Sequence, residues 1–122
     1  MKEVETSKIQ INVCKDISKL KHKNIVNKLL KKYNDICTAM NKVQDIVEKL
    51  QEDDPKGVNK FFNKINKEMK KTEGQDCLLV NGVLFDWKQF NRPEMLGELI
   101  DLALNCMSNE NSKNKLENML LK

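Results

Sequence analysis

The chain has few aromatic side chains and almost no arginine. Aromatics make up 5% of its 122 residues, and Arg92 is the only arginine. A core with so few aromatics must be built from Leu, Ile, Val and Met. Arginine is the side chain that recognises phosphate and carboxylate through a planar pair of hydrogen bonds. The composition therefore argues against a function that depends on bidentate phosphate recognition.

The motifs of common catalytic classes are absent as well. The sequence has one histidine, His22, and contains no phosphate-binding P-loop, no GxGxxG and no Ser-containing nucleophile elbow. The acids Asp53–Asp54 and the Glu94/Glu98 pair are interpreted as helix caps and a solvated helix face. No EF-hand loop surrounds the first pair. We therefore expect no enzyme, no cofactor and no metal site.

The cysteines do not have the spacing of a metal site. They are separated by 23, 40 and 29 residues without any CxxC pair: Cys14, Cys37, Cys77 and Cys106. Two disulfides would allow three connectivities. Cys37 and Cys106 fall within helical apolar patterns, where a thiol packs as a small apolar side chain. We expect reduced thiols, with disulfides as the alternative.

The sequence shows no targeting or membrane segment. No apolar stretch of signal-peptide length follows Met1, and no apolar run is long enough to span a bilayer. We expect a cytoplasmic protein that binds no membrane, with secretion as the alternative if a signal peptide has been removed. The length predicts a single domain, 1–122, with a flexible N-terminus at 1–6.

A regular apolar seam is the strongest pattern in the sequence. Its members alternate at spacings of three and four: Val26, Leu29, Tyr33, Ile36, Met40, Val43, Val47 and Leu50. This a/d pattern is typical of a helix that packs against other helices. It predicts one long helix from about residue 16 or 18 to 51. The seam then packs in the core or, alternatively, against a second copy in a homodimer.

Four helices and a small hairpin are expected in all, so the fold class is mainly α. Asp54–Pro55 starts a second helix, because Asp caps helices and Pro fits their first turn. Asn81–Gly82 between apolar runs predicts a β-hairpin at 77–87. The alternation in 7–13 predicts a strand that can join this hairpin. A mostly apolar third helix covers 95–107, and a short fourth helix follows.

Lysine is distributed unevenly along the chain. Residues 1–75 carry a net charge of +6 and residues 76–122 a net charge of −2. A basic face can bind phosphates without reading sequence. The candidate nucleic-acid contacts lie in the segment 15–32: Lys15, Lys19, Lys21, Lys23, Lys28, Lys31 and Lys32. The second helix adds further lysines. A solvated lysine face is the more common explanation of such a segment, since the Lys/Asn bias is typical of AT-rich bacterial, phage or viral genomes.

Binding to another protein is the function that the sequence favours, because the seam is strong and no other chemistry is present. Trp87 and Phe90, between the hairpin and the third helix, are the candidate contacts, together with Tyr33 on the seam. For Trp87 itself a core position is favoured, with a role as a binding anchor as the alternative. The edge of the small sheet can also accept a partner's strand. We expect an adaptor, assembly chaperone or inhibitor, with sequence-independent nucleic-acid binding as the alternative.

Overall fold

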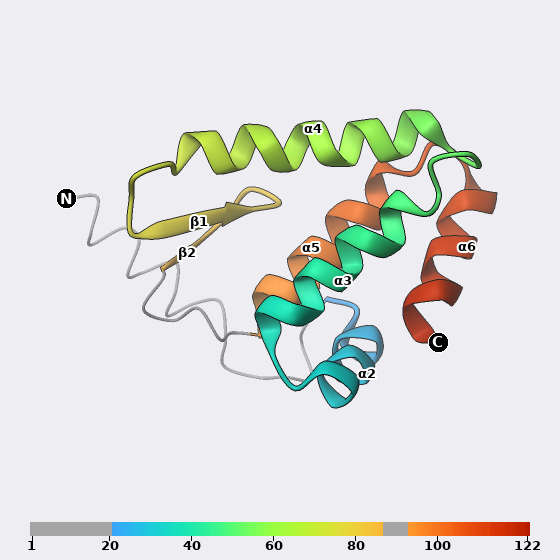
Figure 1. Cartoon of the computed structure of the whole chain (residues 1–122), viewed down its shortest axis with the longest axis horizontal. Helices are drawn as coiled ribbons and strands as arrows, with labels where there is room; N and C mark the ends of the chain where they lie inside the picture. Colours follow the sequence, from blue (N-terminus) through green and yellow to red (C-terminus); the bar gives the residue numbers. More distant parts are fainter. Residues whose placement is uncertain (1–20, 87–92) are drawn as a thin grey trace.

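The computed structural model describes residues 21–86 and 93–122, and this part of the chain is mainly helical, as predicted. Figure 1 shows α3 and α5 in the middle of the molecule, with α4 crossing above them and the hairpin near one end of α4. α6 packs against both α2 and α3. The elements in chain order are α2 (Lys23–Tyr33), α3 (Ile36–Glu48), α4 (Pro55–Lys71), β1 (Cys77–Val80), β2 (Val83–Asp86), α5 (Pro93–Cys106) and α6 (Glu110–Leu121).

The single long helix predicted for the first half of the chain is instead two helices, α2 and α3. Asn34 has a left-handed backbone with φ of 59°, and Asp35 is extended, so the helix cannot continue through them. The N–H of Asn34 donates to the carbonyl of Leu30, and the Asp35 carboxylate accepts from two N–H groups in the first turn of α3. Both helix ends are therefore capped.

The seam forms part of the core within one chain. Its members are buried on both sides of the break, except for Tyr33, which is half-buried. α5 is apolar around most of its circumference and is the most buried helix of the described part, as its sequence predicted. Leu96 and Ile100 of α5, for example, are fully buried in the core.

Asp54 and Pro55 start α4 as predicted. The Asp54 carboxylate accepts the N–H of Gly57, the N–H and hydroxyl of Ser108 and the hydroxyl of Ser112. Burial alone would raise the pKa of Asp54, but these hydrogen bonds outweigh it and hold the pKa far below its usual range. One carboxylate therefore ties the start of α4 to the connection between α5 and α6.

The hairpin turns at Asn81–Gly82 as predicted, with φ of 53° and 79° at these two residues. Positive φ at both central positions is the geometry of a type I′ turn. Glu68 of α4 accepts the N–H of Asn81 at 2.9 Å and that of Gly82 at 2.6 Å. α4 therefore holds the turn of the hairpin in place.

Several predicted features lie outside the described residues. They are the N-terminus at 1–6, the strand at 7–13, Cys14, Lys15, Lys19, Trp87 and Phe90. No helix in the described part of the chain is both long and apolar enough to cross a membrane.

Candidate functional site

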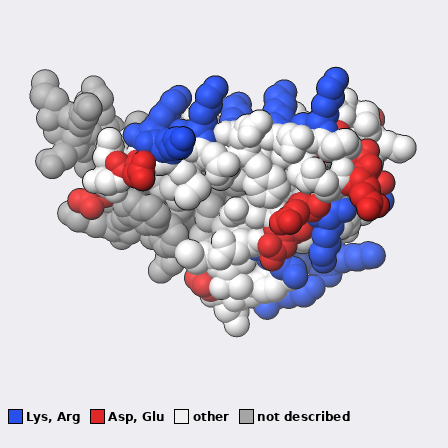
Figure 2. Space-filling view, turned by 45° about the horizontal axis from the view of Figure 1, so that its top comes forward, with Lys and Arg blue, Asp and Glu red and all other residues white. Residues whose placement is uncertain are grey.

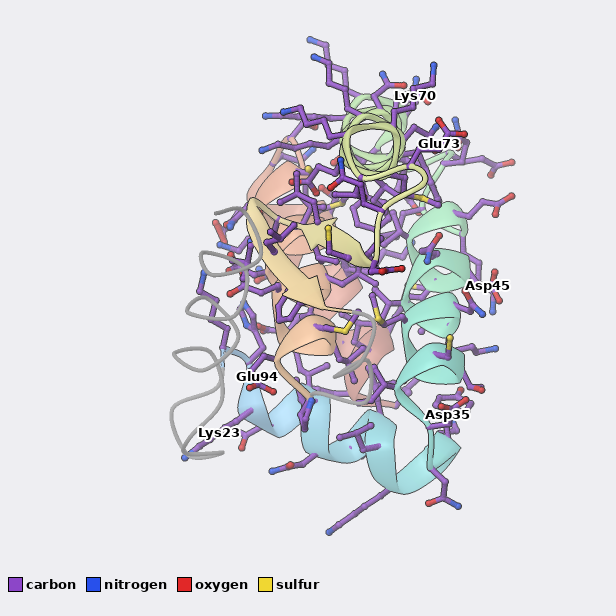
Figure 3. The ribbon with its side chains drawn as sticks, turned by 90° about the vertical axis from the view of Figure 1, so that its left-hand side faces the viewer. Lys23, Asp35, Asp45, Lys70, Glu73 and Glu94 are labelled. Carbon is purple, nitrogen blue, oxygen red and sulfur yellow. The ribbon has the colours of Figure 1, made fainter. Side chains whose placement is uncertain are left out.

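An apolar groove with a volume of about 300 Å³ opens beside β1. We call it the β1 groove. Figure 3 shows how α3, α4 and the hairpin are arranged around it. The buried side chains of Leu99 and Leu102 from α5 form its base. Its remaining lining residues are Cys37, Met40, Asn41 and Gln44 of α3, Ile65, Glu68 and Met69 of α4, and Leu78, Leu79 and Val80 of β1.

The β1 groove follows the outer edge of a strand. Leu78, Leu79 and Val80 all line it, although successive side chains of a strand point to opposite faces. A space that touches three residues in a row therefore lies along the strand's edge. Val80 pairs with Val83 across a two-residue turn, so this pair exchanges hydrogen bonds. The next residue, Leu79, then directs its N–H and carbonyl away from β2, toward the outer edge.

The side chains that line the β1 groove include a flexible methionine and only one charged residue. Met69 is 53% exposed, the one large hydrophobic side chain of the described residues that is so open to solvent. A thioether side chain adjusts its shape to different contacts. Cys37 adds an exposed thiol. Glu68 is the only charged lining residue, and its carboxylate already binds the hairpin turn. The groove therefore suits an apolar segment.

A second surface with a clear chemical character lies on α4, on the side away from the core. We call it the α4 lysine face: Lys56, Lys60, Lys64, Lys67, Lys70 and Lys71, all exposed. With about 3.6 residues per turn, these lysines fall within an arc of about 120°. Figure 2 shows a row of basic side chains along the edge of the molecule formed by α4, and Figure 3 shows Lys70 pointing outward. The only acid of α4 is the buried Glu68.

The lysines that the sequence singled out in 15–32 do not share one role. Lys21 pairs with Glu98 at 3.2 Å and with Asp101 at 3.6 Å. Burial would lower the pKa of Lys21, but these two carboxylates raise it. Lys21 therefore forms ion pairs within the chain, although its side chain is exposed. The others in the described part are exposed on α2 without an ion pair there: Lys23, Lys28, Lys31 and Lys32.

His22 contacts an acid that lies far from it in the sequence. Its Nε2 lies 3.0 Å from Oδ1 of Asp101, which is 79 residues away along the chain. Asn81 donates to Asp101 and to Glu98, both at 3.0 Å. Burial would raise the pKa of Asp101, but hydrogen bonds from His22 and Asn81 and the charge of Lys21 lower it. The cluster joins the start of α2, the hairpin turn and α5.

A His–Asp pair can orient an imidazole for general-base catalysis. Nucleophilic catalysis of the triad kind would also need a Ser, Thr or Cys side chain in contact with the ring. None of the described Ser, Thr or Cys side chains hydrogen-bonds to His22. What the hydrogen bonds of this cluster show is a connection between the start of α2, the hairpin turn and α5.

The Glu94/Glu98 pair is not the solvated helix face that the sequence predicted. Glu94 is 5% exposed, and its carboxylate oxygens have no hydrogen-bond partner among the described residues. Burial raises its pKa. Glu98 is occupied by Lys21 and Asn81. The prediction was wrong because i, i+4 spacing places two side chains on one face without saying whether that face is covered.

The described residues bring together no three His, Cys, Asp or Glu side chains that could hold a metal ion. Cys106 is a buried thiol whose pKa is raised by burial. The sequence did not predict the β1 groove, because the residues that line it come from segments far apart in the chain.

Comparison of the chain with known protein families, with curated proteins and with solved structures finds no match.

Proposed function

We propose that this chain is a non-enzymatic protein-binding domain that receives a segment of its partner in the β1 groove. The observation that carries this proposal is the position of the groove along the outer edge of β1. A strand edge offers backbone hydrogen bonds to an extended peptide, and neighbouring pockets take its alternate side chains. The β1 groove offers both kinds of contact.

The groove also favours a particular kind of segment. Its volume of about 300 Å³ lies at the lower end of ligand pockets, which suits a few apolar side chains of a short segment. Met69, Ile65 and Leu79 would cover these side chains, while the outward N–H and carbonyl of Leu79 would pair with the backbone. Trp87 and Phe90 follow β2 directly in the chain and remain predicted contacts.

A synthetic peptide tests this proposal without knowledge of the natural partner. The probe is a seven-residue peptide of alternating Val and Thr, and the matched control is the same peptide N-methylated at every residue. A fluorophore on Cys37, in a Cys14→Ser background, reports occupation of the groove. We expect the N-methylated peptide to bind at least tenfold more weakly, because it has no backbone N–H to donate to the edge of β1.

Two variants locate the binding site. Met69→Lys places a charge in the groove from an exposed position, so it should weaken binding at least tenfold without unfolding the protein. Asn63→Lys adds the same charge on an exposed position of α4 that does not line the groove, and should leave binding unchanged. Equal binding by both variants, or equal binding of the two peptides, would contradict the proposal.

The α4 lysine face supports nucleic-acid binding as a second candidate function. α4 is about 25 Å long at about 1.5 Å per residue, and its exposed lysines are not offset by an exposed acid within the helix. Lysines in such a row can contact successive phosphates as point charges. The surface lacks arginine and aromatic side chains, so binding would be independent of sequence.

Oligonucleotide titrations at two salt concentrations test this second candidate. If the α4 lysine face binds DNA, changing Lys60, Lys64 and Lys67 to Gln should reduce the salt slope by about 0.9 per contacting lysine. The matched triple change of Lys23, Lys28 and Lys31 to Gln tests the segment that the sequence indicated. Absence of binding at low salt would exclude both surfaces as nucleic-acid sites.

A further inference from the structure

A hollow of about 500 Å³ opens where α2, α3 and the end of α6 meet. We call it the α2–α3–α6 hollow. Its lining contains buried aliphatic side chains from all three helices, Leu29, Ile46 and Leu120, with Met119 half-buried beside them. Figure 1 shows the end of α6 close to α2, on the side of the molecule away from the hairpin. The hollow is therefore separate from the β1 groove.

Five lysines surround this apolar lining: Lys28, Lys32, Lys42, Lys49 and Lys122. They lie on α2, on α3, and directly after α3 and α6, so no single helical periodicity places them together. The lining contains no carboxylate side chain, and none of the five lysines forms an ion pair within the described part of the chain. Figure 2 shows a second group of basic side chains apart from the row along α4.

The positive charges of the five lysines around the hollow repel one another. Lys28 and Lys32 are four residues apart on α2, and like charges at this spacing repel each other. Lys32 is partly accommodated by the Tyr33 ring, with its Nζ 5.7 Å from the ring centroid. The other lysines have no comparable partner among the described residues. An anion in the hollow would relieve the repulsion.

We propose that the α2–α3–α6 hollow binds a phosphorylated amphiphile with an aliphatic body. Lysine binds phosphate as a point charge, and several lysines around one space suit a diphosphate or a phosphate headgroup. The aliphatic side chains would cover the body of the ligand. Apart from the lysines, the only polar side chain in the lining is Tyr33, so nothing there would recognise the polar edge of a base or a sugar.

Farnesyl diphosphate is a suitable probe, because it joins two phosphates to an aliphatic chain. Pyrophosphate carries the charges alone, and farnesol carries the chain alone. Calorimetric titration of the full chain is expected to give affinity for farnesyl diphosphate at least tenfold higher than for either part. Vesicles of phosphatidylcholine with phosphatidic acid test whether the same headgroup chemistry is bound from a lipid surface.

Variants with matched charge changes place the site. The double variant Lys32→Gln/Lys42→Gln should weaken farnesyl diphosphate binding at least tenfold. Lys60→Gln/Lys64→Gln removes the same charge from the α4 lysine face and should leave it unchanged. Met119→Gln should weaken binding of farnesyl diphosphate but not of pyrophosphate, since Met119 contacts only the apolar part. Circular dichroism checks that each variant is folded.

Several results would overturn the proposal. One is equal weakening by the two lysine double variants, which would indicate a diffuse charge effect. Another is equal affinity for pyrophosphate and farnesyl diphosphate, which would leave no role for the aliphatic lining. Binding to vesicles without binding of free farnesyl diphosphate would indicate attraction to a charged surface, and tighter binding of a short oligonucleotide would indicate a nucleic-acid surface.

Discussion

Asp54 concentrates four hydrogen bonds on one carboxylate that is only 2% exposed. It caps α4 and at the same time binds Ser108 and Ser112, which lie more than fifty residues later in the chain. Asp54→Ala would leave buried donors without an acceptor. We expect the free energy of unfolding to fall by about 2–3 kcal/mol, measured by urea denaturation.

The neighbouring acid is the control for this change. Asp53 forms a 2.8 Å ion pair with Lys115, but both side chains are about half exposed. Exposed ion pairs contribute little, so Asp53→Ala should cost less than about 1 kcal/mol. Equal losses for the two variants would mean that the hydrogen bonds of Asp54 do not stabilise the fold as its burial implies.

The lowered pKa of Asp54 also leads us to expect that the free energy of unfolding depends on pH. The folded pKa of Asp54 is lowered, so its stabilising contribution is fully present above its ordinary value near 4 and is lost as the pH falls below that value. Unfolding free energies measured from pH 6 to pH 2.5 should therefore fall more steeply for the natural chain than for Asp54→Ala. Parallel curves would show that Asp54 titrates alike in the folded and unfolded states.

Asn34 decides whether α2 and α3 are two helices or one. Its left-handed backbone is tolerated by Asn and Gly but is costly for other residues. Asn34→Ala should therefore destabilise the protein by about 1 kcal/mol, and Asn34→Gly should not. In a continuous helix the order would be reversed, because Ala is the best helix former and Gly among the worst. Thermal unfolding of the two variants distinguishes the arrangements.

The sequence predicted the elements whose signals are local. Asp54–Pro55 marked the start of α4, and Asn81–Gly82 marked the hairpin. The break at Asn34 was missed because the three–four spacing runs through it, so periodicity alone cannot separate one helix from two that share a core. The local signal was present, since Asn is common after a helix and Asp before one. The capping residues Asn34 and Asp35 therefore indicate the helix boundary better than the apolar spacing does.

The candidate sites could not be predicted in the same way. The β1 groove depends on Leu79 lying beside side chains of α3 and α4, and the His22–Asp101 contact joins residues 79 positions apart. Such contacts depend on tertiary packing, and a single sequence contains no periodic trace of them. Only the lysines of α4 could be listed in advance, because one helix places them all.

The three surfaces differ in their chemical character. The β1 groove is apolar and nearly uncharged, the α4 lysine face is basic and exposed, and the α2–α3–α6 hollow combines lysines with an apolar lining. α3 and α4 each contribute to two of these surfaces, but no residue belongs to more than one, so a substitution in one should leave the others intact. Additivity of this kind is expected for sites without shared partners.

At the scale of the whole molecule, the seam should stabilise the single chain and not a dimer. Val43 is fully buried on the seam of α3. Val43→Asp would bury an unpaired charge, which costs about 3–5 kcal/mol, a large part of a domain's stability. We therefore expect loss of helical circular dichroism, whereas Asp45→Asn, on the exposed side of α3, should change little. Thermal unfolding of the natural chain should not depend on protein concentration. If the seam were a dimer interface, Val43→Asp would give a folded monomer, and unfolding of the natural chain would shift with concentration.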